Sequence, residues 1–186
     1  MNIKPIACQR HAYHCVVALI LLVCTCACEK YHTTLKGCCS QPGISESFGD
    51  ARLYIPNIFT PNFDHINDNL LVVGINIKTI RSLRITDLNG KVVREVRDSP
   101  FDHYQNVWDG MDGEKFYEGA FRLAITVERE DGALFTFESY VCSYPCGFAE
   151  SNVKLSMTGC QFADQVNPDY QFDPMIPTQE PLNCFE

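Results

Sequence analysis

The sequence predicts an all-β protein folded as an antiparallel sandwich, because it combines strict side-chain alternation with hairpin turns and lacks any long helical period. The clearest alternation lies in residues 121–128, where Phe, Leu, Ile and Val are separated by Arg, Ala, Thr and Glu. A period of two predicts a strand with one apolar face and one wet face. We expect any helices to be brief.

Two glycine-containing turns join predicted strands into hairpins. Asp131-Gly132 separates residues 121–128 from a returning strand at residues 134–141. Asn89-Gly90 precedes a strand predicted at residues 91–96, and this dipeptide tolerates the positive φ angles that a type I′ turn demands. Short strands joined by such turns favour two sheets packed around one core.

Trp108 is the only tryptophan, and it precedes Asp109-Gly110 in a loop rich in Gly and Asp. We interpret its indole as a plug between the two sheets, whose burial contributes about 2–3 kcal/mol. The alternative is an exposed aromatic platform for a sugar or a peptide. Replacement by alanine would mainly reduce stability in the first case and ligand binding in the second.

Residues 1–27 have the layout of a secretory signal peptide. Lys4 and Arg10 supply positive charge, and residues 16–23 form an unbroken apolar run that ends in small and cysteine-rich sequence. A membrane-spanning helix needs about 20 apolar residues, so this run is too short for a permanent transmembrane anchor.

Cys28 is the candidate lipid acceptor. Ala27 precedes it, as a small residue does in the lipobox of bacterial lipoproteins, although Thr25 stands where leucine is usual. Cys24 and Cys26 are alternative acceptors, and an ordinary cleaved signal is the alternative to lipidation. Lipidation would give the mature chain an acyl anchor held by membrane lipid.

Residues 28–52 contain Ser, Thr, Gly and Pro and break any apolar period, which predicts a tether. Six cysteines follow the candidate acceptor, and an even number in an exported chain predicts disulfides rather than zinc. We expect the adjacent pair to reach distant partners, which would staple the tether onto the folded body. The six candidates are Cys38, Cys39, Cys142, Cys146, Cys160 and Cys184.

Residues 142–186 form a C-terminal extension. Its later part contains Pro168, Pro174, Pro177 and Pro181, which predicts an irregular segment wrapped over the body and pinned by Cys160 and Cys184. The chain without its first 27 residues has 13 basic and 23 acidic residues, a net charge of −10. Because nucleic-acid binding needs a basic footprint, a nucleic-acid partner is disfavoured.

Three stretches carry a resemblance to a known family: Tyr54-Ile-Pro-Asn-Ile-Phe-Thr-Pro-Asn-Phe-Asp-His-Ile-Asn-Asp68, Val107-Trp-Asp-Gly110 and Glu118-Gly-Ala-Phe-Arg-Leu123. Together they resemble the gliding motility-associated C-terminal domain, the Ig-like module that serves as a type B sorting signal in type IX secretion. The resemblance implies an Ig-like sandwich over residues 53–141 and an address at the outer membrane or cell surface. It also implies structural roles for Trp108, Asp109, Gly110 and Gly119.

The loop at residues 62–68 is the best candidate for a metal site. Oxygen-bearing side chains at Asn62, Asp64, Asn67 and Asp68 have a spacing similar to loops that wrap calcium, which takes six to eight oxygen ligands. We favour the alternative that Asn62, Asp64 and Asn67 cap turns with their own side chains. The family pattern has glycines at the two positions that Phe63 and His65 occupy here.

We predict a binding module without catalytic activity. The sequence contains no nucleophile elbow, zinc-protease helix or phosphate-binding glycine loop, and we interpret Ser99, Asp102 and His103 as a chance cluster. The favoured function is a lipid-anchored accessory protein that docks onto an outer-membrane or secretion-complex protein by a strand edge or by loops. The alternatives are a secreted type IX cargo and a surface adhesin that binds glycans.

Overall fold

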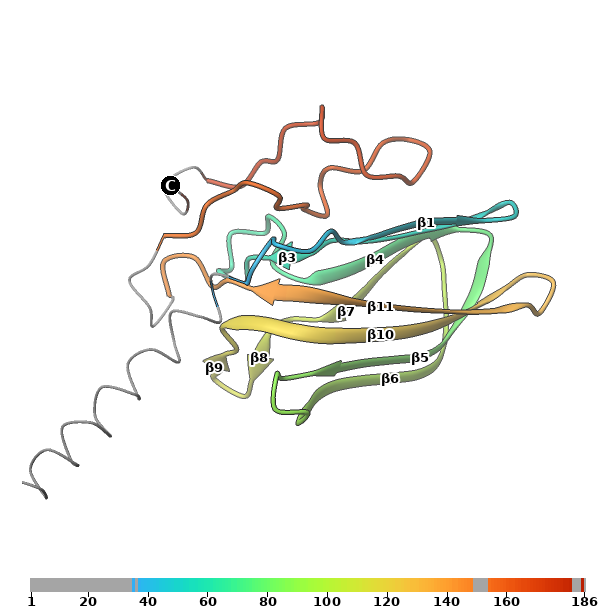
Figure 1. Ribbon diagram of the computed structural model, residues 1–186, viewed down its shortest axis with the longest axis horizontal. Helices are drawn as coiled ribbons and strands as arrows, with labels where there is room; N and C mark the ends of the chain where they lie inside the picture. The colour runs from blue at the N-terminus through green and yellow to red at the C-terminus, as the bar shows by residue number, and fades with distance from the viewer. Residues whose placement is uncertain (1–34, 36, 149–153, 182–184, 186) are drawn as a thin grey trace, which may run out of the picture. The chain divides into compact units, whose positions relative to one another are not determined.

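Strands make up the regular secondary structure of the described residues in the computed structural model (Figure 1). The structure describes residue 35, residues 37–148, residues 154–181 and residue 185. The strands are β1 (Ile44–Phe48), β2 (Ala51–Ile55), β3 (Ile58–Phe59), β4 (Leu70–Ile75), β5 (Ile77–Thr86), β6 (Val92–Pro100), β7 (Tyr104–Trp108), β8 (Met111–Asp112), β9 (Lys115–Phe116), β10 (Gly119–Arg129) and β11 (Leu134–Ser143).

Two sheets face each other across the core (Figure 1). One has the strand order β1-β2-β4-β7, the other has the order β3-β11-β10-β5-β6, and β8 and β9 form a small separate ribbon. Every strand pair is antiparallel except β3 and β11, which run parallel and pair Ile58 with Cys142. The predicted all-β sandwich is confirmed, with this one parallel pair as a departure.

Alternating side chains of both sheets build the core, as the sequence predicts. Phe121, Leu123 and Ile125 of β10 are buried, whereas Arg122 between them is exposed. They belong to one apolar cluster with Leu53 of β2 and other inward-facing residues of the opposite sheet. Burying such aliphatic and aromatic side chains stabilises the fold by about 1.5–3 kcal/mol each.

The sandwich begins earlier than predicted. β1 pairs with β2 from Ile44 opposite Ile55 to Phe48 opposite Ala51, and Gly49 makes the turn at a φ of 70°. Polar residues dominate β1 because it lies at the edge of its sheet and buries little beyond Ile44. The boundary between tether and domain therefore moves from residue 53 to residue 44, since linker-like composition concealed an edge strand.

Both predicted hairpins form, but their turns differ from type I′. Gly90 has a φ of 89°, whereas Asn89 is not among the residues with positive φ. Gly90 N donates to Asp87 O, and Asp87 N donates to Lys91 O. This is a type I turn followed by a glycine bulge, the pattern of a three-residue hairpin loop, and the turn at Gly132 has the same bonds. One left-handed residue per turn is enough, so only the glycine is required.

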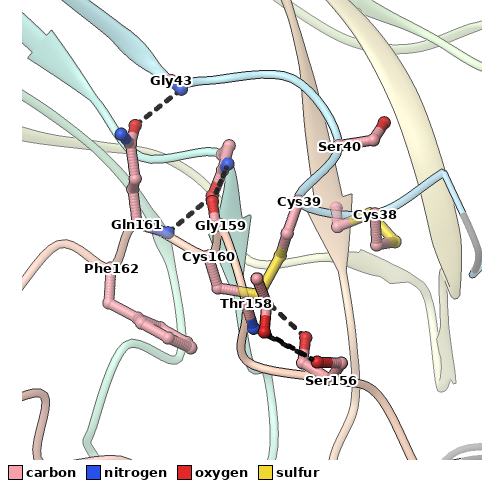
Figure 2. The surroundings of a disulfide bond; sticks show 12 residues. Cys38, Cys39, Ser40, Gly43, Ser156, Thr158, Gly159, Cys160, Gln161 and Phe162 are labelled. Atoms are coloured by element: carbon pink, nitrogen blue, oxygen red, sulfur yellow. Dashed lines mark hydrogen bonds between the residues drawn. A yellow bond between two sulfur atoms is a disulfide. The ribbon is translucent and has the colours of Figure 1, made fainter.

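Two disulfides connect the adjacent cysteines to distant partners, as predicted. Cys38 pairs with Cys142 at the end of β11, with Cα atoms 5.5 Å apart, and Cys39 pairs with Cys160 of the extension, with Cα atoms 4.6 Å apart (Figure 2). Cys146 is also disulfide-bonded. Cys184 lies outside the described residues.

The extension at residues 154–181 has no strand of its own and lies against the body. Gly43 N donates to the Gln161 side chain at 2.7 Å, and Gln161 N donates to Asn57 Oδ1 at 2.7 Å (Figure 2). Tyr54 Oη donates to Phe162 O at 2.9 Å. A second apolar cluster includes Phe162, so the extension is packed as part of the fold.

Candidate functional site

In the loop at residues 62–68, side-chain oxygens accept hydrogen bonds from the loop's own backbone N–H groups. Asp68 Oδ1 accepts hydrogen bonds from the backbone N–H groups of Asn62 and Phe63 at 2.9 and 2.8 Å, and its Oδ2 accepts one from His65 at 2.8 Å. Asn62 Oδ1 accepts from Asp64 N at 3.0 Å. Carboxylate bonds of this kind fix a tight loop without a ligand.

Asp64 and Asn67 extend this pattern. Asp64 Oδ1 accepts from Ile66 N at 2.9 Å, and Asn67 Oδ1 accepts from Asp164 N of the extension at 3.2 Å. Among the described residues, no group of three or more His, Cys, Asp or Glu side chains is arranged to hold a metal ion. The geometry of the four candidate ligands therefore fits capped turns, and calcium binding at this loop stays a prediction.

Replacing Asp68 by alanine tests the two interpretations. Loss of three hydrogen bonds to a carboxylate is expected to destabilise the domain by about 1–3 kcal/mol. If the side chains cap turns, urea unfolding will give the same loss in calcium and in a calcium chelator. A loss that appears only with calcium present would instead establish a metal site.

Bulky residues adopt left-handed backbone conformations in this loop. Phe63 has a φ of 66° and His65 has a φ of 69°. These are the two positions at which the family pattern has glycine, which reaches such angles without steric cost. For other residues the left-handed region costs about 1–2 kcal/mol, so the loop is strained at both positions.

Three phenylalanines form an exposed cluster, which we name the aromatic tip: Phe63 and Phe148 from two loops, and Phe116 from the short strand β9. The ring centroids of Phe63 and Phe116 are 5.3 Å apart, and those of Phe116 and Phe148 are 5.6 Å apart. Phe63 is 63% exposed and Phe148 is 58% exposed, whereas Phe116 is half-buried. The cluster was not predicted from the sequence, although a phenylalanine at a position where the family pattern has glycine was a signal for it.

Trp108 does not form an exposed platform. It is 4% exposed and contacts the rings of Phe59 and Phe121, with centroids 5.2 and 5.0 Å away. Trp108 ends β7 of one sheet and packs against Phe59 of β3 and Phe121 of β10 in the other sheet, so its indole lies between the two sheets as the plug interpretation expects. Its Nε1 has no hydrogen-bond partner within the described part of the chain.

The residues after Trp108 build the turn into β8. Asp109 Oδ1 accepts from Met111 N at 3.1 Å, and Gly110 O accepts from Tyr117 N at 2.7 Å. Gly110 has a φ of 71°, and a Cβ there would lie 2.9 Å from the Phe59 ring. Gly119 begins β10 with a φ of 114°. These motif residues have conformational roles in the strand connections beneath the aromatic tip.

A groove of about 580 Å³ lined by polar and apolar residues, which we name the polar groove for its charged side chains, lies over β5, β10 and β11 beside the chain entering β1. Its volume is within the range of ligand sites. Arg122 and Tyr140 line it, directly opposite each other on neighbouring strands. The Arg122 side chain has no hydrogen bond or ion pair with any described residue, whereas each of the other described arginine side chains has a partner.

Glu180 connects the extension to the strand end before the loop. It is 3% exposed, and Thr60 Oγ1 donates a hydrogen bond to its Oε1. The pKa of Glu180 is raised to about 7, chiefly by burial and also by the nearby carboxylates of Asp64 and Asp164, whereas hydrogen bonds from Thr60 and Asn67 lower it. Burial outweighs these hydrogen bonds, so the neutral form of Glu180 is favoured below about pH 7.

Stability is expected to fall as pH rises from about 4.5 to about 7, because the unfolded chain releases the Glu180 proton at its ordinary pKa while the folded chain retains it. Glu180→Gln is expected to remove this slope and to be more stable than the natural chain at pH 8 by about 1–3 kcal/mol. Urea unfolding at pH 5 and pH 8 measures the difference, with the exposed Glu46→Gln as the control. An unchanged slope in Glu180→Gln would contradict the assignment.

In the polar cluster near β7, no hydrogen bond between described residues joins Ser99 to His103. His103 Nδ1 lies 2.8 Å from Asp102 Oδ1, but Ser99 Oγ accepts from Gln105 Nε2 at 2.7 Å. The serine is thus engaged by a neighbouring amide. Both contacts lie in a polar, partly exposed region at the sheet edge.

Cys28, with the rest of the predicted leader, lies outside the described residues. No helix in the described ranges has the length and apolar character needed to span a bilayer. Comparison of the chain with protein-family models, curated proteins and solved structures finds no match. The family resemblance therefore stays a prediction from the motifs.

Proposed function

We propose that this chain is a lipid-anchored protein of the outer membrane or cell surface, whose sandwich is a non-catalytic binding module for a type IX secretion or gliding-associated envelope complex. The observation that carries the proposal is the pair of disulfides, Cys38 with Cys142 and Cys39 with Cys160. Disulfides persist in oxidising compartments and are rare in the cytosol, so they support export.

The anchor is tested in cells that produce the full chain. Lipidation at Cys28 is expected to make processing sensitive to globomycin and to give an N-terminal peptide with the mass of an acylated cysteine. Cys28→Ser is the variant, and Cys24→Ser and Cys26→Ser are matched controls. An unlipidated peptide that begins after an ordinary cleavage site would favour the secreted-cargo alternative and remove the anchor.

A glycan-binding adhesin is the second candidate, and the polar groove favours it. An unpaired Arg122 beside the Tyr140 ring offers a cation and an aromatic face in one concave surface. Under this alternative, retention on an acidic polysaccharide would be lost in Arg122→Gln and kept in Arg97→Gln, whose arginine is paired with Glu95. Lack of retention in the natural chain would remove the adhesin alternative.

A further inference from the structure

We propose that the aromatic tip, formed by Phe63, Phe116 and Phe148, docks into an apolar pocket of a protein partner whose rim is basic. The inference rests on the proposed function as a binding module and assigns the surface that does the binding. Exposed clusters of aromatic side chains mark interaction sites, because such rings supply large contact areas at low entropic cost. The three rings contact one another in a single patch.

The construction of the loop holds Phe63 outward. Asp68 binds three backbone N–H groups on both sides of Phe63, so the loop is rigid where the ring projects. The backbone of Phe63 is left-handed, a conformation that is unfavourable for a bulky residue and tends to be kept where it serves function. A glycine would relieve the strain, yet the chain has a phenylalanine that is 63% exposed.

The extension covers other apolar residues but leaves the aromatic tip in solvent. Phe162 and Leu155 are buried against Tyr144 and Ile58 in the second apolar cluster. The exposed Phe148 lies just beyond that cluster along the chain. The exposure of the aromatic tip is therefore local to its own segments, because the neighbouring apolar residues are covered by the extension.

The acidic residues next to the aromatic tip favour a partner with basic residues. Exposed acids flank its rings along the chain: Asp64 beside Phe63, and Asp109, Asp112 and Glu114 before Phe116. Lys115 is the one exposed base among residues 109–118 of the described chain. Exposed acids next to an apolar centre complement a basic rim around an apolar pocket and are repelled by anionic lipid.

Site-specific photo-cross-linking in cells that produce the full chain tests the inference. A photoreactive phenylalanine analogue replaces Phe63 or Phe148, with Tyr104 of β7, an exposed aromatic remote in sequence, as the matched control position. We expect one discrete protein adduct, of the same mass at both tip positions and absent at position 104. Adducts with lipid alone, dimers of this chain, equal adducts at position 104, or no adduct would each overturn the inference.

Once cross-linking has identified the partner, its binding affinity for variants of this chain gives a quantitative test. Phe63→Gly is expected to weaken its binding by roughly tenfold or more, while its melting temperature stays equal to or above that of the natural chain. His65→Gly relieves strain in the same loop and should keep full binding. Glu114→Lys should weaken binding at low salt and lose this effect at high salt. Unchanged binding in Phe63→Gly would overturn the inference.

The N-terminal mass and thiol state of the same preparations separate the two proposals. A lipidated, disulfide-bonded chain without tip adducts would contradict the aromatic-tip inference and leave the proposed address intact. An unlipidated chain whose tip positions still react with one protein would contradict the lipid anchor and leave the docking surface intact.

Discussion

Replacement of Trp108 by alanine is expected to destabilise the domain by about 3–5 kcal/mol, the cost of emptying a buried site of this size. The indole is 4% exposed and lies among Phe59, Tyr117 and Phe121, so its loss removes ring contacts with three neighbours at once. For a domain of this length the melting temperature should fall by roughly 10 °C. Thermal and urea unfolding measure both quantities.

Two variants separate the packing role of Trp108 from other effects. Tyr104→Ala removes an aromatic from the same strand, but Tyr104 is 54% exposed and its loss should cost under about 1 kcal/mol. Trp108→Phe should recover most of the stability, because the Nε1 that it removes has no hydrogen-bond partner among the described residues. If the alanine variant kept natural stability but lost ligand binding, the packing role would be contradicted and Trp108 would instead be a binding platform.

The sandwich could be predicted where local sequence and tertiary environment agree. β10 alternates between core and solvent along nearly its whole length, so its period directly reports burial. The two hairpins formed at the predicted glycines because a left-handed residue is needed there in either turn type. Cys38 and Cys39 were expected to diverge, since adjacent cysteines bridge each other only with strain.

Other features depend on contacts that no local pattern encodes. β1 is an edge strand whose Ser and Glu side chains face solvent, so its composition is that of a linker although its backbone is paired. The placement of the extension follows from single long-range bonds, such as that between Gly43 and Gln161. Side-chain period gives no information on such bonds, because they depend on the fold already formed.

The aromatic tip was missed for a different reason. Phe63, Phe116 and Phe148 are far apart in sequence, and each alone is more simply interpreted as a core residue. Only the folded loops bring the three rings together in solvent. Phe63 was nevertheless conspicuous, since the loop around it requires a conformation that suits glycine.

Removal of either disulfide is expected to cost about 2–5 kcal/mol, and removal of the two should have different structural consequences. The pairs close loops of 104 and 121 residues, so the entropic contributions of the two cross-links differ by well under 1 kcal/mol. What differs is the segment that each releases. Cys38→Ser with Cys142→Ser frees the N-terminal segment from the end of β11, whereas Cys39→Ser with Cys160→Ser frees the extension.

Limited proteolysis and hydrogen exchange distinguish these consequences, with both partners replaced together so that no single thiol can pair wrongly. Without Cys39 and Cys160, we expect cleavage and faster exchange within residues 154–181 before global unfolding, because the extension would lose this covalent link and depend on its hydrogen bonds to the body and on the second apolar cluster. Without Cys38 and Cys142, the extension should remain protected until the sandwich unfolds. Natural protection of the extension in the first variant would mean that packing around Phe162, and not the cross-link, fixes it on the body.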